Sequence, residues 1–139
     1  SYMDEKDFKS LALVRFERAK ELYMEANELV KMDSYKSANN RVFYAIEKCI
    51  KALLSTQQMD VETHNGAVSQ FNLLFIHKEN TAFTKDDYQK IVKADRIRNA
   101  SDYDDFYIVN KAETEELIKF SLEFIRKTDE YIKKSFADG

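Results

Sequence analysis

The sequence predicts an all-α protein, an antiparallel bundle of four or five helices. The chain of 139 residues contains no proline and only two glycines, so few residues interrupt a helix. Hydrophobic residues make up 44% of the chain and recur at steps of three and four, the spacing of one helix face. A chain of this length supports one continuous core, and we therefore expect a single domain over residues 1–139.

The first two helices are expected at about Asp4–Met32 and Tyr35–Ser55. Asp33 and Ser34 lie between them and supply turn and N-cap chemistry. The first helix has one apolar stripe, made of Ala12, Phe16, Ala19, Tyr23, Ala26 and Val30. The second has a broader apolar face, which predicts a central position and consists of Ala38, Val42, Phe43, Tyr44, Ala45, Ile46, Cys49, Ile50, Leu53 and Leu54.

Three further elements follow a polar connection over residues 56–63. A shorter helix carries the apolar residues Val68, Phe71, Leu74 and Phe75. Thr84 and Asp87 form the pattern of a capping box, which predicts the start of a fourth helix with Tyr88 and Ile91 on its apolar stripe. Residues 104–110, DDFYIVN, are predicted to be extended or irregular, and a last helix is expected at about Lys111–Ser135.

Composition limits the functions that the chain can have. Lys and Arg number 22 against 25 Asp and Glu, a balance that argues against a general nucleic-acid coat but allows a local basic patch. The single cysteine, Cys49, excludes an internal disulfide and fits a reducing cytoplasm, where we expect the protein. No apolar run approaches the roughly 20 residues that span a bilayer, so no membrane association is expected. Two histidines and one cysteine at unrelated spacings predict no metal site, and no phosphate-binding loop or cofactor motif is present.

The fourth helix changes character toward its end. Helical steps from its apolar stripe lead to Asp95, Arg98, Asn99 and Asp102. Buried polar groups cost several kcal/mol unless they have partners, so this placement needs an explanation. One interpretation is a structural network in which Arg98 pairs with the two aspartates. The other is the wall of a cleft that holds a phosphate or nucleotide, with Arg98 as the bidentate anion ligand.

Three segments together resemble the HEPN domain, the higher-eukaryote and prokaryote nucleotide-binding family. They are SANNRVFYAIEKCIKALL (37–54), THNGAVSQF (63–71) and RNASDYDDF (98–106), and an aromatic-rich last helix follows them in the same order as in that family. The resemblance extends from about residue 8 to residue 134. It is greatest to small prokaryotic members whose fourth helix ends in an arginine followed shortly by Asp-Tyr. The resemblance implies an antiparallel helical bundle, usually a homodimer, with a cleft near the dimer interface. Many members are metal-independent ribonucleases, others bind nucleotides or proteins, and many pair with a minimal nucleotidyltransferase in toxin–antitoxin systems.

The ribonuclease motif of that family is matched only in its first half. The motif is an arginine, a polar residue and, after about four to six intervening residues, a histidine; Arg98 and Asn99 match its beginning. Tyr103 or an aspartate stands where the histidine would be, and histidine is the side chain whose pKa suits proton transfer near neutrality. By the longest spacing, Tyr107 matches a tyrosine that the partner modifies by nucleotidyl transfer in some members.

Three more residues are candidates for the same site. The resemblance places the second helix against the fourth, so Arg41 and Tyr44 are candidate ligand-binding residues; Arg41 either lines the cleft opposite Arg98 or forms a surface ion pair. His64 either bonds to local backbone at the start of the third helix or acts catalytically across the dimer.

The sequence thus leaves three hypotheses for function. The leading one is a nucleotide- or nucleic-acid-binding partner of a minimal nucleotidyltransferase in a toxin–antitoxin-type pair, homodimeric, with a cleft around Arg98, Asn99 and Asp102. The second is a metal-independent ribonuclease in which Tyr103 or His64 replaces the usual histidine. The third is a non-catalytic helical scaffold that binds another protein.

Overall fold

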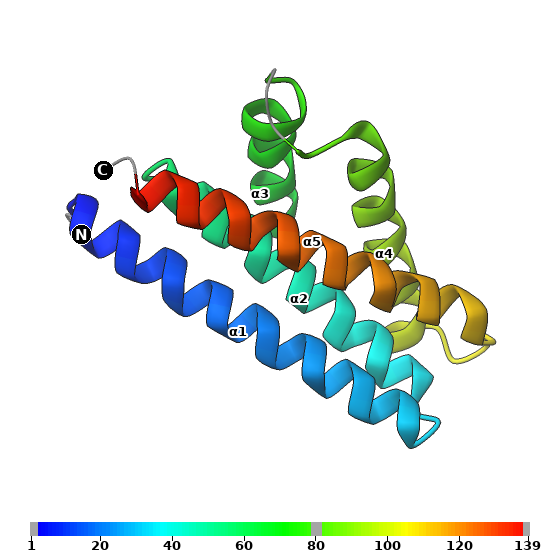
Figure 1. Cartoon of the computed structure of the whole chain (residues 1–139). Coiled ribbons are helices and arrows are strands. Elements are labelled where there is room, and N and C mark those ends of the chain that lie inside the picture. Colours follow the sequence, from blue (N-terminus) through cyan, green and yellow to red (C-terminus); the bar gives the residue numbers. More distant parts are fainter. Residues whose placement is uncertain (1–2, 79–81, 138–139) are drawn as a thin grey trace.

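The computed structural model describes residues 3–78 and 82–137, and within them the chain is helical without a strand. Its helices are α1 (Glu5–Lys31), α2 (Tyr35–Thr56), α3 (His64–Phe71), α4 (Lys85–Tyr103) and α5 (Lys111–Ala137) (Figure 1). A π-helical turn, η1 (Asn72–Ile76), extends α3. The prediction of an all-α protein is confirmed, and the expected helix bounds agree with the structure to within a few residues.

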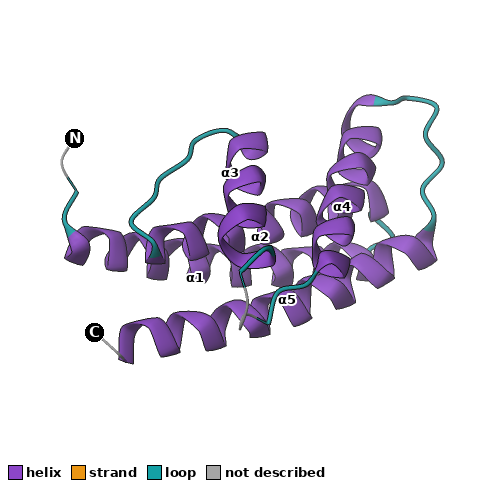
Figure 2. Cartoon of the chain, turned by 90° about the horizontal axis from the view of Figure 1, so that it is seen from above, coloured by secondary structure: helices purple, strands orange, loops and turns teal. Residues whose placement is uncertain are grey.

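The three long helices lie side by side, and the two shorter ones stand across them. α1 and α2 form an antiparallel hairpin, and α5 runs alongside in the direction of α2 (Figure 1). α3 and α4 project from this layer on one side, as the view from above shows (Figure 2). α2 contacts every other α-helix, as its broad apolar face predicts. Each of the short helices α3 and α4 therefore crosses α2, and the candidate polar residues of α4 face it.

An aromatic cluster fixes α3 and η1 on the long helices. Phe71 stacks on Phe75 at 5.5 Å between ring centroids, and Phe124 of α5 packs edge-on against Phe71 at 5.7 Å. Phe83 and Tyr131 complete the cluster. Burying rings of this size contributes several kcal/mol by area and about 0.5–1.5 kcal/mol per pair from ring geometry. The end of α3 and η1 are thereby packed against α5.

The starts of α4 and α2 can be compared with the N-cap predictions made from the sequence. Thr84 and Asp87 form the predicted capping box, and Asp87 also accepts a hydrogen bond from Lys127 at 2.8 Å, which ties α4 to α5. Ser34 is the N-cap residue of α2, as predicted, but its side chain makes no capping hydrogen bond. The reason is backbone geometry: Asp33 is left-handed with φ 58°, and Ser34 follows with ψ 66°, outside the extended conformation that a capping side chain requires.

The segment after α4 is irregular, as predicted. α4 ends at Tyr103 and the helix resumes only at Lys111. Across the ranges that the structure describes, none of the helices is both long enough and apolar enough to cross a bilayer.

Candidate functional site

Side chains from α2, α3 and α4 converge where the short helices meet α2. We call this group the Arg98–His64 cluster; it consists of Phe43, Glu47, His64, Asp95 and Arg98. α2 supplies the phenylalanine and the glutamate one helical turn apart, α3 supplies the histidine as its first residue, and α4 supplies the aspartate and the arginine. The Arg98 guanidinium and the His64 ring both pack against Phe43, at 4.3 Å and 4.6 Å from its ring centroid.

Arg98 is largely buried but incompletely bonded. Its side chain is 13% exposed, and one terminal nitrogen donates to Asp95 Oδ1 at 3.0 Å. The other lies 4.0 Å from Asp102 Oδ2, too far for a hydrogen bond. Its Nε–H is buried and has no acceptor among the described residues. A guanidinium offers five N–H donors, so Arg98 has hydrogen-bonding capacity that the described protein groups do not use.

His64 is held between two carboxylates. Its Nδ1 lies 2.8 Å from Glu47 Oε2, and its Nε2 lies 3.8 Å from Asp95 Oδ2. Burial alone would raise the pKa of Glu47, but the hydrogen bond from His64 and the nearby charges of Lys51, His64 and Lys48 outweigh it, so the pKa lies below its ordinary value. Glu47 is therefore an ionised, buried acceptor, which favours the tautomer of His64 with the proton on Nδ1 and leaves Nε2 for other chemistry.

The backbone at the start of α3 aims His64 into the cluster. Thr63 is the N-cap residue, and its hydroxyl accepts a hydrogen bond from the Gly66 N–H at 3.1 Å. A Cβ at position 66 would lie 2.7 Å from the Thr63 hydroxyl and 2.9 Å from a Val61 methyl group. Only glycine fits this close approach without a shift of its neighbours, which explains why the motif reads His-Asn-Gly.

A second polar layer connects the cluster to α1. Asn40 donates to Asp102 Oδ2 at 2.9 Å and accepts from Arg41 at 2.6 Å. Arg41 also donates to Glu25 of α1 at 3.1 Å, so it is tied to α1 and Asn40 and not brought to Arg98. Tyr44, half-buried, lies 5.8 Å from the Arg98 guanidinium, measured to its ring centroid.

The remaining sequence candidates lie at the edge of the site or beyond it. Asn99 is exposed and donates to the backbone oxygen and the carboxylate of Asp95, at 3.1 and 3.2 Å. Tyr103 is 76% exposed, and the structure gives it no hydrogen bond or ring contact with the described residues. Tyr107 is half-buried; burial, and to a lesser degree Glu113, raise the pKa of its phenol against a smaller opposing effect of Arg96.

A pocket of about 280 Å³ opens beside the cluster, between α3 and α4. We call it the α3–α4 pocket; His64 and Asp95 line one end of it, and the rest is lined by Asn65, Val68, Ser69, Asn72, Tyr88, Ile91 and Val92. The cluster is therefore reachable from the surface on the His64 side. Among the described residues, no group of three or more His, Cys, Asp or Glu side chains is arranged to hold a metal ion.

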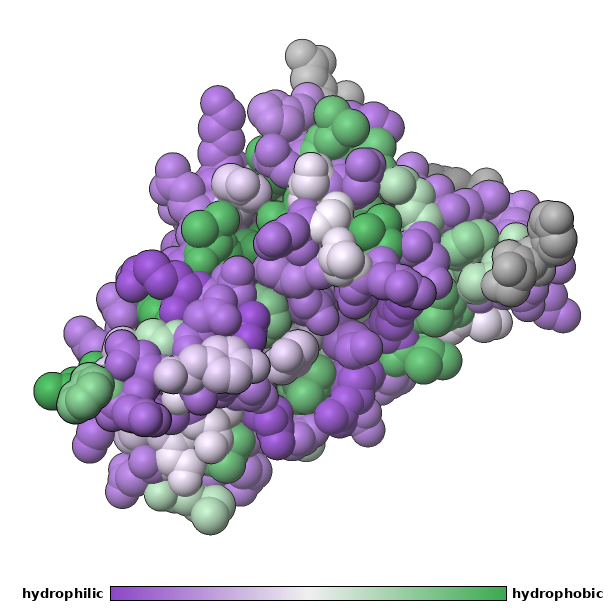
Figure 3. Space-filling model, turned by 180° about the vertical axis from the view of Figure 1, so that it is seen from behind, coloured by the Kyte–Doolittle hydropathy of each residue, from purple (hydrophilic) through white to green (hydrophobic). Residues whose placement is uncertain are grey.

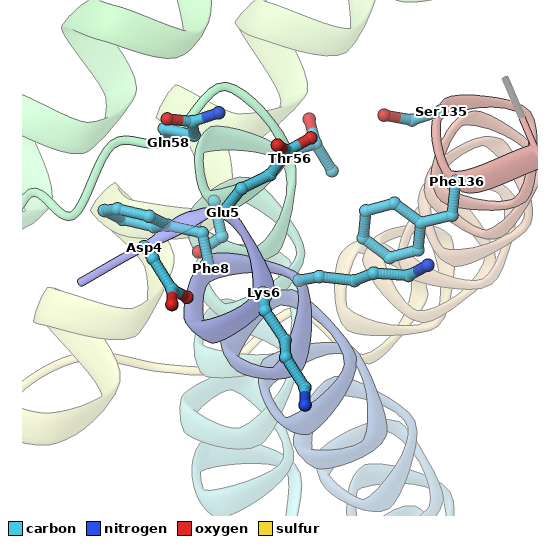
Figure 4. A pocket seen from close by; sticks show the side chains of 10 residues that line it. Asp4, Glu5, Lys6, Phe8, Thr56, Gln58, Ser135 and Phe136 are labelled. Carbon is cyan, nitrogen blue, oxygen red and sulfur yellow. The ribbon is translucent and has the colours of Figure 1, made fainter. Parts of the chain in front are cut away.

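A larger pocket of about 530 Å³ lies at the far end of the molecule, where α1 begins and α2 and α5 end. Phe8 and Phe136 lie on opposite sides of it (Figure 4). Its lining contains no histidine, cysteine or arginine. Size alone does not make it a reactive site, and the chemistry of the chain is concentrated at the Arg98–His64 cluster.

Sequence reasoning missed two members of the cluster, Phe43 and Glu47. A signal for Glu47 was present, because it is the one acidic residue on the buried face of α2 and buried acids need partners. His64 was considered, but only as a local backbone partner or across a dimer. The structure instead brings it to Glu47 and Asp95 of its own chain.

The fold places the chain in the class of small all-α helical bundles, here with an arginine and a histidine that both pack against Phe43. Within that class the chain belongs to the HEPN domain family, whose family model matches residues 12–131.

Three relatives are similar over most of their length. "Putative toxin MJ0142" of Methanocaldococcus jannaschii is 30% identical over 118 residues, which cover 84% of this chain and 79% of that protein. "Putative toxin MJ0605" of the same organism is 30% identical over 99 residues, 70% and 72% of the two chains. A "UPF0332 protein" of Archaeoglobus fulgidus is 25% identical over 122 residues, 88% and 95% of the two chains.

Proposed function

We propose that this HEPN-domain chain is one component of a toxin–antitoxin-type pair and that its Arg98–His64 cluster binds a phosphate group of a nucleotide or single-stranded RNA. The observation that carries the proposal is the state of Arg98, which packs over Phe43, makes one hydrogen bond, to Asp95, and has a buried Nε–H without an acceptor among the described residues. The names of the two Methanocaldococcus relatives support the toxin–antitoxin context.

Phosphate binding has to compete with Asp95 for the guanidinium. The existing contact is one hydrogen bond at 3.0 Å, and the Asp95 side chain is 27% exposed, so water can solvate it after the exchange. A phosphate offers two oxygens to the planar guanidinium and forms a bidentate pair, which is stronger than the single bond it replaces.

The pairing partner is proposed to be a minimal nucleotidyltransferase, and the chain itself to be a homodimer. The support is the family resemblance and a group of exposed apolar side chains in and after the last turn of α4: Tyr103, Phe106 and Ile108 are 76%, 93% and 89% exposed. Figure 3 shows hydrophobic atoms protruding at the end of the molecule that carries the α4–α5 connection. We place the nucleotidyltransferase contact there, because Tyr107, the proposed modification site, lies in the same segment.

In the modification, the Tyr107 phenol oxygen attacks the α-phosphate of a nucleoside triphosphate bound to the partner. A bond forms between the phenol oxygen and phosphorus, pyrophosphate leaves, and the phenol proton passes to solvent or to the partner. The raised pKa of Tyr107 keeps the phenol protonated, so the partner has to supply the base.

The binding test compares Arg98→Ala with a matched surface arginine. Fluorescence anisotropy of a labelled single-stranded RNA is measured with wild type, Arg98→Ala and Arg126→Ala; Arg126 is 64% exposed on α5 and pairs with Glu123. A lost charge-assisted pair of about 1.5–3 kcal/mol predicts at least tenfold weaker binding for Arg98→Ala and little change for Arg126→Ala. Equal affinities for all three proteins would contradict the proposal and favour a protein-binding scaffold.

A second candidate function is metal-independent RNA cleavage, and the position of His64 favours it. The reaction requires a base to remove the 2′-hydroxyl proton, attack of that oxygen on phosphorus, and protonation of the departing 5′-oxygen, which leaves a cyclic phosphate and a free hydroxyl. Glu47 anchors Nδ1 of His64, so Nε2 is the atom that would move the proton. Arg98 would stabilise the charge that develops on the phosphorane.

Cleavage of single-stranded RNA, measured in the presence of a chelator, decides whether His64 or Tyr103 replaces the missing motif histidine. We expect wild type and Tyr103→Phe to cleave and His64→Asn not to cleave. Loss of cleavage in Tyr103→Phe alone would assign the role to Tyr103. Absence of cleavage by every protein, with RNA binding retained, would leave binding as the function of the cluster.

A further inference from the structure

The α3–α4 pocket is built from residues of two separate helices and of η1. Asn65, Ser69 and Asn72 follow one another at steps of four and three along α3 and η1. The opposite wall comes from α4, where Tyr88, Val92 and Asp95 follow the same spacing. Between the two walls lie the buried side chains of Val68 and Ile91, which are 9% and 1% exposed.

The polar side chains of the α3 wall have few hydrogen-bond partners among the described residues. The side chains of Asn65 and Ser69 make no hydrogen bond with the described residues, and Asn72 has a single weak contact of 3.4 Å to His77 Nε2. Each amide presents two donors and one acceptor. The opposite wall contributes the partly buried ring of Tyr88, which packs on the core and offers a flat apolar surface.

We propose that the α3–α4 pocket is a nucleobase subsite, which receives one base of a single-stranded RNA next to the phosphate at the Arg98–His64 cluster. This inference rests on the proposed phosphate site. The two are contiguous, because His64 and Asp95 belong to both. A base in the pocket places its ribose and phosphate toward His64.

Three properties match the pocket to a base. Its volume of about 280 Å³ lies just below the range for drug-sized ligands, roughly 300–1,000 Å³, which suits one ring system better than a whole nucleotide. The apolar floor and the tyrosine ring accept the faces of a base, and the free amides accept its edge, the combination by which proteins read single-stranded RNA. The pocket lining contains no lysine or arginine, so the cation that holds the phosphate lies outside the pocket, at Arg98.

The test compares two labelled RNAs of equal length, one complete and one with abasic sites, by fluorescence anisotropy. Wild type is expected to bind the complete RNA about tenfold more tightly, since one stacked base contributes about that factor or more. Asn65→Leu and, independently, Ser69→Leu place an apolar side chain in the pocket, and both positions are exposed, so folding is retained. Either variant should lose the preference for the complete RNA. Gln89→Leu, also exposed on α4 but outside the pocket lining, should keep it.

Failure of this inference can be told from failure of the phosphate site. Arg98→Ala should weaken both RNAs by a similar factor. Weakening by Arg98→Ala, together with equal wild-type affinity for complete and abasic RNA, would overturn the base subsite and keep the phosphate site. Unchanged preference in both leucine variants would also overturn the subsite. Failure of wild type to bind either RNA would overturn both.

Discussion

Replacing Arg98 by methionine tests whether the arginine contributes to RNA binding or to the stability of the fold. Methionine retains an unbranched apolar side chain that packs over Phe43, but it removes the charge and every N–H donor. In the wild type the guanidinium stacks on the ring at 4.3 Å, pairs with Asp95 at 3.0 Å and buries an Nε–H that has no acceptor among the described residues. The first two features stabilise the fold and the third destabilises it.

The three contributions nearly cancel. Losing the cation–π contact costs about 1–2 kcal/mol in a largely buried position. Losing the pair with the partly exposed Asp95 costs at most about 1 kcal/mol. Removing the unsatisfied, buried Nε–H of Arg98 stabilises the folded state by about 1–3 kcal/mol. We therefore expect Arg98→Met to change the free energy of unfolding by no more than about 1 kcal/mol, whereas Arg98→Ala also loses side-chain packing and should cost about 2–3 kcal/mol.

The assay is urea denaturation followed by far-ultraviolet circular dichroism, with RNA binding measured on the same preparations. Near-wild-type stability of Arg98→Met combined with at least tenfold weaker RNA binding is the predicted result. A loss of more than about 3 kcal/mol in Arg98→Met with unchanged RNA binding would refute the reasoning, because Arg98 would then be a structural residue.

Three further predictions follow from the buried groups. Because the pKa of Glu47 is lowered in the folded protein, its contribution to stability is present above the ordinary glutamate pKa of about 4.3 and is lost as the pH falls through the lower folded value. Denaturation experiments on Glu47→Gln should therefore show a free energy of unfolding that varies less with pH over that acidic range than in wild type. Parallel profiles for the two proteins would contradict this prediction. Cys49 is fully buried with its pKa raised to about 12, so iodoacetamide should label it only as fast as the protein opens; rapid labelling of the native protein would contradict its position. Gly66→Ala should lower the melting temperature, because the added Cβ would lie 2.7 Å from the Thr63 hydroxyl and destabilise the start of α3. An unchanged melting temperature would contradict this prediction and show that the neighbouring side chains move aside at no cost.

The sequence predicted those elements whose signals are local. Thr84 and Asp87 lie three residues apart and satisfy each other wherever the helix packs, so the capping box was recognisable. The broad apolar face of α2 likewise predicted its contact with every other helix. The position of the Ser34 N-cap was predicted correctly, but the absence of its side-chain hydrogen bond was not, because the left-handed conformation at Asp33 has no distinctive pattern in the sequence. The π-helical turn of η1 has none either.

The candidate site was predictable on one helix only. Helical spacing placed Asp95, Arg98 and Asp102 together on α4, and the structure shows them in contact. The contributions of Glu47 and His64 depend on how α3 crosses α2, which is set by the packing of Phe71, Phe75 and other aromatic side chains that are distant in sequence. Spacing within one helix carries no information on that crossing.

The central claim is that an RNA phosphate binds Arg98 beside His64, and nitrogen-15 NMR of the arginine Nε–H tests it most directly. Arg98→Met assigns the Arg98 signal by its absence, and a single-stranded RNA is then titrated into the wild-type protein. We predict that the Arg98 Nε–H resonance shifts as its hydrogen bonding changes, together with the ring resonances of His64. RNA that binds while both sets of resonances stay unchanged would place the binding surface elsewhere and contradict the account.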